Sequence, residues 1–141
     1  MVKARINWLE DACFQGETDS GHTILMDGPP ELGGANRGAR PMETLLIGMG
    51  GCTAFDVVSI LRKGRQTIND CVVEIEAQRA EEVPKVFTHI HLKYVVSGED
   101  LQEAKVKRAV ELSAEKYCSA TIMLSAAVEI THSYEVVQAT A

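Results

Sequence analysis

The sequence lacks three features that would each have indicated a different class of protein. It has no excess of positive charge, because 20 Asp and Glu outnumber 14 Lys and Arg for a net charge of −6, which argues against binding to nucleic acid. Residues 1–8 contain no apolar run of the kind a signal peptide needs. The four cysteines form no Cys-x-x-Cys pair and no Cys/His cluster with zinc spacing, so we expect neither a metal nor a cofactor. These absences predict a cytoplasmic protein with free thiols.

What is present fits a soluble globular protein. The 141 residues are 45% hydrophobic and 24% charged, and this length is typical of a single domain, residues 1–141. The segment most similar to a membrane span, Thr44 to Leu61, carries glycines and Asp56. We interpret it as a buried helix and expect no contact with a membrane.

The order of strand and helix patterns predicts an α+β fold. Two long strands, Ile68–Arg79 and Val86–Ser97, follow a first helix, Pro41–Lys63, which Gly64 can end. Short turns between strands favour antiparallel sheets packed on helices. The other expected elements are three strands in a meander (Val2–Trp8, Cys13–Glu17, His22–Asp27), a glycine- and proline-rich loop (Gly28–Ala39), a helix from Asp100 to Tyr117 opened by a capping box of Asp100 and Glu103, a short helix (Ala120–Ala126) and a last strand (Val128–Val137).

The helix Pro41–Lys63 is apolar on all sides, with leucine, isoleucine, valine, methionine and phenylalanine around its whole circumference. A helix that is apolar on every face must be covered on every face. One small chain with this pattern of strands can hardly do so alone, and we therefore expect a homodimer with this helix near the interface.

Cys52 lies in this helix, after Gly48, Gly50 and Gly51, and Asp56 follows one turn later on the same face. Glycine inside a helix costs about 1 kcal/mol relative to alanine, so three of them indicate either close packing or room for a ligand beside the thiol. Asp56 would be costly to bury unpaired, which favours an ion pair with Arg37, Arg40 or Arg5.

Cys118 lies at the junction between two helical segments. A thiol at a helix N-terminus is expected to have a lowered pKa; the alternative is a small residue that fills the joint between helices. Two thiols that can meet define a redox pair, and Cys52 with Cys118 is the pair that the sequence favours. The remaining two, Cys13 and Cys71, lie on strand patterns and are expected to be core or edge residues.

The segment Pro41-Met-Glu-Thr-Leu-Leu-Ile-Gly-Met-Gly-Gly-Cys-Thr-Ala-Phe-Asp-Val-Val-Ser-Ile-Leu61 resembles the OsmC/Ohr family of thiol-dependent hydroperoxide reductases, and especially its YhfA-like branch. A second segment, Ser113 to Ser119, is similar to the part of that family that carries its second cysteine. The two segments occur in the family's order, and the resemblance extends over nearly the whole chain.

The resemblance implies an intertwined homodimer in which antiparallel sheets wrap around central helices. It implies that Cys52 attacks an organic hydroperoxide and becomes a sulfenic acid, that Cys118 resolves it as a disulfide, and that a dithiol reductant restores both. Family members pair a glutamate, directly after the proline, with an arginine beside the first thiol. Here Met42 occupies that position and Glu43 comes one residue later, while Arg37 and Arg40 are both candidates for the arginine.

A second class of function stays open because of Met42. The protein could be a dimer that binds a small apolar or thiol-reactive ligand at its interface without catalysis.

Overall fold

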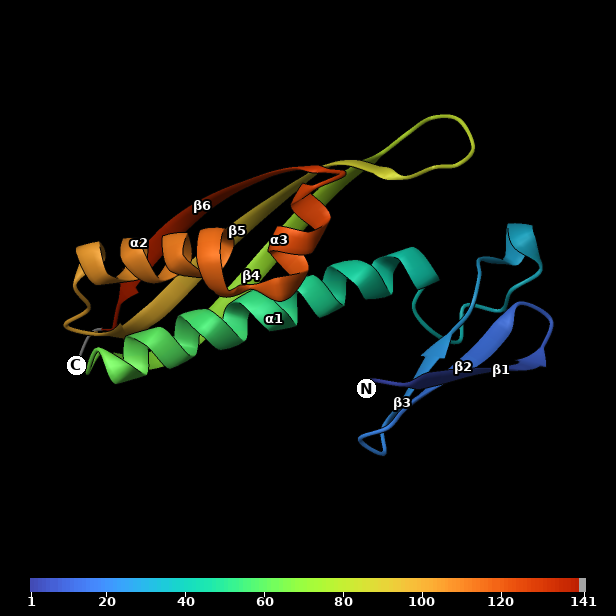
Figure 1. Ribbon diagram of the computed structural model, residues 1–141, viewed down its shortest axis with the longest axis horizontal. Helices are drawn as coiled ribbons and strands as arrows, with labels where there is room; N and C mark the ends of the chain where they lie inside the picture. Colours follow the sequence, from blue (N-terminus) through green and yellow to red (C-terminus); the bar gives the residue numbers. More distant parts are fainter. Residues whose placement is uncertain (140–141) are drawn as a thin grey trace. The chain divides into compact units, whose positions relative to one another are not determined.

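The computed structural model describes residues 1–139, which form two compact units, Met1–Ile47 and Gly48 onward. Figure 1 shows the helices and strands of both units. The prediction of a single domain stays a prediction. The order of elements agrees with the sequence-based expectation, three strands, a helix, two strands, two helices and a strand.

The first unit contains an antiparallel sheet in the order β1-β2-β3, which confirms the predicted meander. Its strands are β1 (Ala4–Glu10), β2 (Cys13–Thr18) and β3 (Thr23–Met26). The first strand begins two residues later than expected, and it is not half-buried within this chain, since Ile6 and Trp8 are 59% and 68% exposed. Cys13 is buried, as expected for a core residue.

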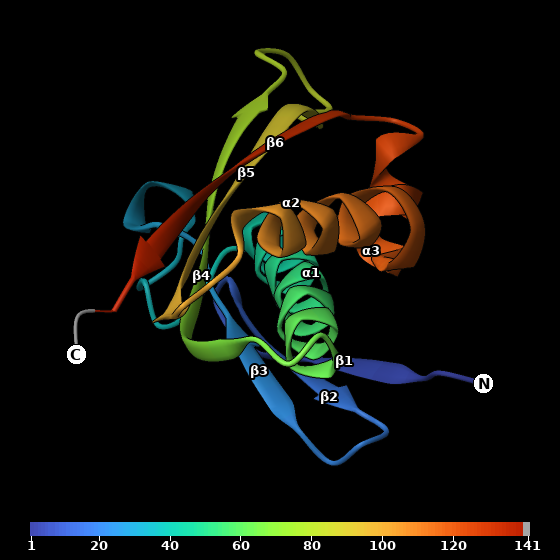
Figure 2. The ribbon, with the colours of Figure 1, turned by 90° about the vertical axis from the view of Figure 1, so that its left-hand side faces the viewer.

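The second unit has three helical segments on one face of a three-stranded sheet, β4-β5-β6 (Figure 2). The sheet consists of β4 (Thr67–Arg79), β5 (Phe87–Glu99) and β6 (Glu129–Gln138). The predicted alternation along β5 is confirmed, because its inward-facing residues are fully buried: Ile90, Leu92, Tyr94 and Val96.

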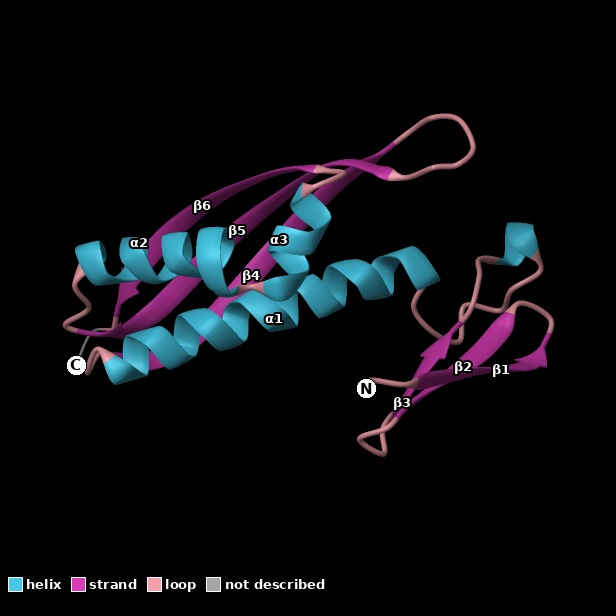
Figure 3. Ribbon diagram, in the orientation of Figure 1, coloured by secondary structure: helices cyan, strands magenta, loops and turns pink. Residues whose placement is uncertain are grey.

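One pairing in this sheet differs from the antiparallel arrangement that we predicted. The pair β4–β5 is antiparallel, but β5 and β6 run parallel, with Ile90 opposite Ile130. The helices between β5 and β6 (Figure 3) supply the long crossover that a parallel pair needs. The fold is therefore α+β with two three-stranded sheets, one antiparallel and one mixed.

The long helix α1 (Pro41–Lys63) has the predicted ends. Only one stripe of it is buried within the chain, at four-residue spacing: Met49, Thr53, Val57 and Leu61. Large side chains elsewhere on the helix are exposed, with Leu45, Ile47 and Phe55 at 48%, 65% and 75%. Within one chain, therefore, one side of the helix is buried and the other side is exposed.

The helical region before Cys118 differs from the continuous helix that we predicted. The α-helix α2 covers Glu103–Leu112, and a π-helical turn, Ser113–Tyr117, follows it. The capping box is also wrong, because Gln102 occupies the N-cap position without a side-chain hydrogen bond, and Asp100 has a φ of 50°, outside the helix. A last short helix, α3, covers Ser119–Ser125.

Candidate redox site

Cys52 on α1 and Cys118 at the start of α3 are neighbours in the second unit. Both are free thiols, with Cys118 fully buried and Cys52 partly exposed. Their side chains are close enough for Cys52 to raise the pKa of Cys118 through a contact and through its charge. The two cysteines that the sequence singled out are therefore near one another in the same unit, and their roles as a redox pair stay a prediction.

The environment of Cys118 reverses our expectation for its thiol. Burial raises the pKa of Cys118 above its usual value, and Cys52 raises it further. Two hydrogen bonds from Thr121 act in the opposite direction, its backbone N–H and its hydroxyl lying 3.4 and 3.1 Å from Cys118 Sγ. Desolvation outweighs these donors, so Cys118 is a protonated thiol at neutral pH.

A buried chain of hydroxyl groups lies beside the thiols, and sequence reasoning missed it. Thr53 Oγ1 is 2.6 Å from the Tyr94 hydroxyl and 2.7 Å from Ser113 Oγ. Ser113 in turn donates to Asp56 Oδ2 at 3.0 Å. Burial raises the pKa of Tyr94 to about 12, although its hydrogen bond with Thr53 lowers it, so Tyr94 stays neutral. The sequence signal that could have indicated this series was the presence of polar residues at buried positions, Thr53 on α1 and Tyr94 on β5.

Asp56 does not form the ion pair that we expected within the residues described. Its recorded partner is the Ser113 hydroxyl, and the arginines proposed for it have other partners. Arg5 Nε donates to Asn7 Oδ1, and Arg37 and Arg40 bind groups of the first unit. The Ser113 hydroxyl thus supplies one hydrogen bond to the Asp56 carboxylate but no positive charge beside it.

The three glycines before Cys52 have different surroundings. A Cβ on Gly50 would lie 3.0 Å from Ile75 Cδ1 of β4, so this glycine permits close packing of the helix on the sheet. A Cβ on Gly48 or Gly51 would have nothing within 4 Å. Packing therefore explains one of the three glycines, and the other two leave the backbone open.

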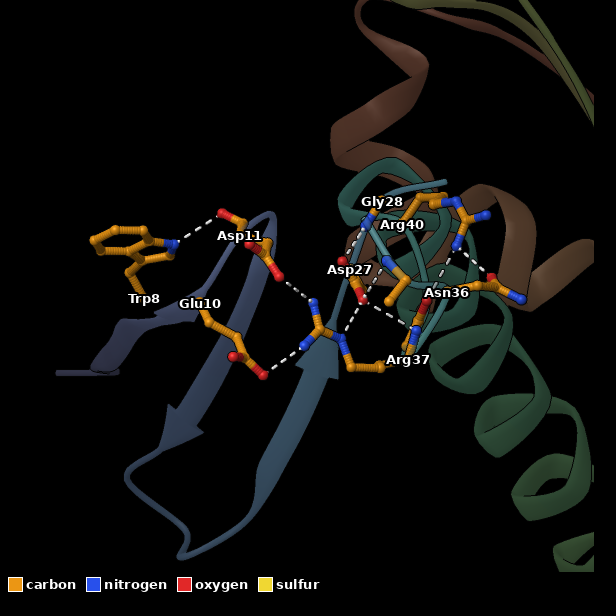
Figure 4. Close-up of polar contacts among 10 residues, drawn as sticks. Trp8, Glu10, Asp11, Asp27, Gly28, Asn36, Arg37 and Arg40 are labelled. Carbon is orange, nitrogen blue, oxygen red and sulfur yellow. Dashed lines mark hydrogen bonds and ion pairs between the residues drawn. The ribbon is translucent and has the colours of Figure 1, made fainter. Parts of the chain in front are cut away.

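Arg37 holds the loop before α1 in place (Figure 4). Its Nε donates to the buried carboxylate of Asp27 at 2.7 Å, and its NH1 forms an ion pair with Glu10 at 2.7 Å. The Arg37 side chain holds the pKa of Asp27 far below its usual range, helped by backbone N–H donors that include Gly28 and Ala35. Since Asp11 lies 3.6 Å from the same guanidinium, the charge of Arg37 is already surrounded by carboxylates.

Arg40 has neutral partners instead. Its guanidinium donates to Asn36 Oδ1 at 2.7 Å and to the Gly38 carbonyl at 3.3 Å (Figure 4). Glu43 accepts the backbone N–H of Arg40 at 2.7 Å, so its carboxylate caps the first turn of α1. Among residues 1–139, no carboxylate lies within ion-pair distance of the Arg40 side chain.

Comparison with known proteins places the chain, but not the roles of its thiols, in a family. The family model described as OsmC-like protein matches residues 33–133. The chain belongs to the OsmC-like family. The resemblance seen in the sequence is thereby confirmed, and α1, which is long and apolar enough to cross a membrane by length and composition alone, is the core helix of a soluble OsmC-like protein.

Relatives of this OsmC-like protein include sequences and solved structures. It is 54% identical to Protein YhfA of Escherichia coli (strain K12) over 138 residues, which are 98% of this chain and 100% of YhfA. The crystal structure of a hypothetical protein from Aquifex aeolicus VF5 is similar with a TM-score of 0.87 and 31% identity, covering 99% and 98% of the two chains. The organic hydroperoxide resistance protein OhrB of Bacillus subtilis shares the fold at 16% identity, with a TM-score of 0.64 and coverage of 96% and 98%.

The ion pair between Asp27 and Arg37 predicts a contribution to the free energy of unfolding that depends on pH. Because the pKa of Asp27 is lowered in the folded protein, its contribution is complete above the ordinary carboxyl value of 3.8 and is lost as the pH falls through the folded value. We expect Asp27→Asn to lower the denaturation midpoint at neutral pH, and the difference from the wild type to shrink in strongly acidic solution. Urea unfolding at several pH values measures this. A difference in denaturation midpoint that is the same at every pH would contradict an ionic contribution from this pair.

Proposed function

We propose that this protein reduces organic hydroperoxides with a Cys52/Cys118 redox pair. The observation that carries the proposal is the contact between a partly exposed thiol and a fully buried one on adjoining elements. It is supported by membership of a family that includes hydroperoxide resistance proteins. The expected setting is the cytoplasm, with a dithiol as the reductant and without a cofactor, nucleic acid or membrane as a partner.

The reaction balances with these two thiols and the peroxide alone. The Cys52 thiolate attacks the terminal oxygen of the hydroperoxide, a sulfur–oxygen bond forms, the oxygen–oxygen bond breaks, and the alkoxide leaves as an alcohol after taking a proton. The Cys118 thiol then attacks the Cys52 sulfenic acid, and water leaves as the disulfide forms. An external dithiol reduces the disulfide by thiol exchange.

The family resemblance implies an arginine that stabilises the thiolate, and of the two candidates, Arg37 and Arg40, we favour Arg40 because of the charges around each one. An arginine that is shared with carboxylates lowers a thiol pKa less than a free one. Arg37 is shared among Asp27, Glu10 and Asp11, whereas Arg40 has neutral partners. Glu43 already serves as the cap of α1, so we do not give it the position of the family's glutamate.

A binding module is the second candidate, and one observation favours it. A hollow of about 540 Å³ beside α1 is lined by Phe55, Asp56 and Tyr117 among others, and it could hold a small ligand with both apolar and polar groups. A ligand retained through purification and visible by native mass spectrometry, together with Cys52 that is inert to peroxide, would favour this function over catalysis.

The exposed face of α1 supports a homodimer. Phe55 is a large apolar side chain at 75% exposure on a core helix, and solvent exposure of such a residue is unfavourable. A second copy of the chain is the partner that the family resemblance implies.

The thiol assignment is tested by two substitutions. Cys52→Ser should abolish the consumption of cumene hydroperoxide, because a serine hydroxyl cannot supply a thiolate. Cys118→Ser should allow one turnover and then leave Cys52 as a sulfenic acid that dimedone can trap. Coupled assays with a dithiol and mass spectrometry measure both. Full multiple-turnover activity in both variants would contradict the assignment.

The arginine assignment is tested by a matched pair of variants. Arg40→Gln should slow the oxidation of Cys52 by peroxide, since a charge that favours the thiolate is lost. Arg37→Gln should mainly destabilise the loop and slow the oxidation less. Single-turnover kinetics with cumene hydroperoxide compare the two. A larger effect from Arg37→Gln would transfer the role to Arg37.

The dimer is tested on the exposed face of α1. Phe55→Asp should prevent assembly, because burying an unpaired carboxylate costs several kcal/mol, and Glu115→Asp is a control on an exposed residue of the π-turn. Analytical ultracentrifugation at micromolar concentration measures the mass of each. A folded wild-type monomer under these conditions would contradict the dimer.

A further inference from the structure

Ser113 forms hydrogen bonds both with the helix that carries Cys52 and with Cys118 itself. Its hydroxyl contacts Thr53 Oγ1 at 2.7 Å and Asp56 Oδ2 at 3.0 Å, and both partners are on α1, with Thr53 directly after Cys52. Its carbonyl accepts the backbone N–H of Cys118 at 2.8 Å. One fully buried residue therefore connects the two halves of the thiol pair.

The bond from Cys118 N–H to the Ser113 carbonyl closes the π-helical turn. It joins residues five apart in sequence, whereas an α-helix joins residues four apart. π-Helical turns are rare and are frequent at functional sites. Here the extra residue in the turn places Cys118 after Ser113 rather than within a regular helix, with Cys118 in an extended conformation at φ −74° and ψ 103°.

The hydrogen bonds around Ser113 favour one orientation of its hydroxyl. Each hydroxyl has a single proton to donate, and Ser113 Oγ has two acceptors that can only accept, Asp56 Oδ2 at 3.0 Å and the Thr53 carbonyl at 3.4 Å. The shorter bond, to a carboxylate, favours Asp56, and with that bond formed Thr53 donates to Ser113 and Tyr94 donates to Thr53. The chain therefore runs from a neutral tyrosine to a carboxylate, and each member depends on the next for its orientation. A hydrogen bond to a charged group is stronger than one between neutral groups, so Asp56 is the anchor of the chain.

We propose that Ser113 is the positioning residue that holds Cys118 against Cys52 for formation of their disulfide. Positioning matters for this thiol because it is buried and protonated. In the closing step the sulfur–sulfur bond forms, the sulfur–oxygen bond of the Cys52 sulfenic acid breaks, and the Cys118 proton leaves with that oxygen as water. Only the peroxide origin of the sulfenic acid rests on the function proposed above. The contribution of Ser113 to the disulfide does not.

The test measures the disulfide without peroxide. The full-length protein is equilibrated with reduced and oxidised glutathione, quenched with acid and alkylated, and the Cys52–Cys118 disulfide is quantified by peptide mass spectrometry. Ser113→Ala should lower the equilibrium constant for disulfide formation roughly ten- to a hundredfold, the range for losing a hydrogen bond to a charged group. Tyr94→Phe is the matched control. This substitution removes a buried hydroxyl from the same hydrogen-bonded series, but Tyr94 has no bond to the segment that carries Cys118. The equilibrium constant for the disulfide in Tyr94→Phe should therefore change less than about twofold, even if this variant unfolds as easily as Ser113→Ala.

A second pair of variants applies if Ser113→Ala does not fold. Asp56→Ala removes the anchor and should lower the same equilibrium constant, whereas Asp56→Asn keeps a neutral acceptor oxygen for Ser113 and should restore part of it. Equal constants in the wild type, Ser113→Ala and Asp56→Ala would overturn the proposal, as would a wild type that forms no such disulfide at any glutathione ratio.

A peroxide experiment separates this role from the proposed function. With cumene hydroperoxide, Ser113→Ala should form the Cys52 sulfenic acid at the wild-type rate but keep it longer, which increases dimedone labelling. A wild type that is inert to peroxide but shows the expected glutathione equilibria would contradict the peroxidase function and support the role of Ser113. An equal sulfenic acid lifetime in both proteins would contradict that role.

Discussion

The buried contact between Ser113 and α1 is the constraint on which the thiol site depends. Thr53 of α1 is hydrogen-bonded to Ser113, 60 positions later in the segment before Cys118, and to Tyr94 of β5, 41 positions later. All three residues are fully buried. Unpaired hydroxyls would be costly there, so the helix, the sheet and the π-turn must adopt this one arrangement to satisfy them all.

The asymmetry between the two thiols follows from their places around this contact. Cys52 is partly exposed on α1, which suits the attacking thiol of the proposed reaction. Cys118 is enclosed, and burial decides its pKa in spite of its place at the start of α3, because desolvation outweighs the two donors of Thr121. A protonated thiol is a weak nucleophile. Its reaction therefore depends more on proximity than on intrinsic reactivity, as expected for a resolving thiol.

Local sequence signals predicted the elements well and their pairing less well. Pro41 and Gly64 gave the bounds of α1, and the alternation along β5 gave its buried side. The parallel pairing of β5 with β6 arises because α2 and α3 return the chain to the starting end of β5, which depends on contacts between distant residues. The π-turn escaped prediction for a related reason. Ser113 alone is a weak signal for any helix type, and the hydrogen bond that holds it in the π-turn comes from Thr53, 60 positions away.

The sequence also predicted the candidate thiols but not the charges around the loop before α1. Arg37 and Arg40 are equivalent in a pattern of residues, and only the fold separates them, by placing the buried Asp27 against Arg37. A buried carboxylate requires a partner, so Arg37 is committed to holding the loop. Arg40 keeps neutral partners, so its charge is not shared with a carboxylate of the loop. The same reasoning applies to Glu43, whose carboxylate is used to begin α1. The fold thus distinguishes three charged residues that the sequence alone could not rank.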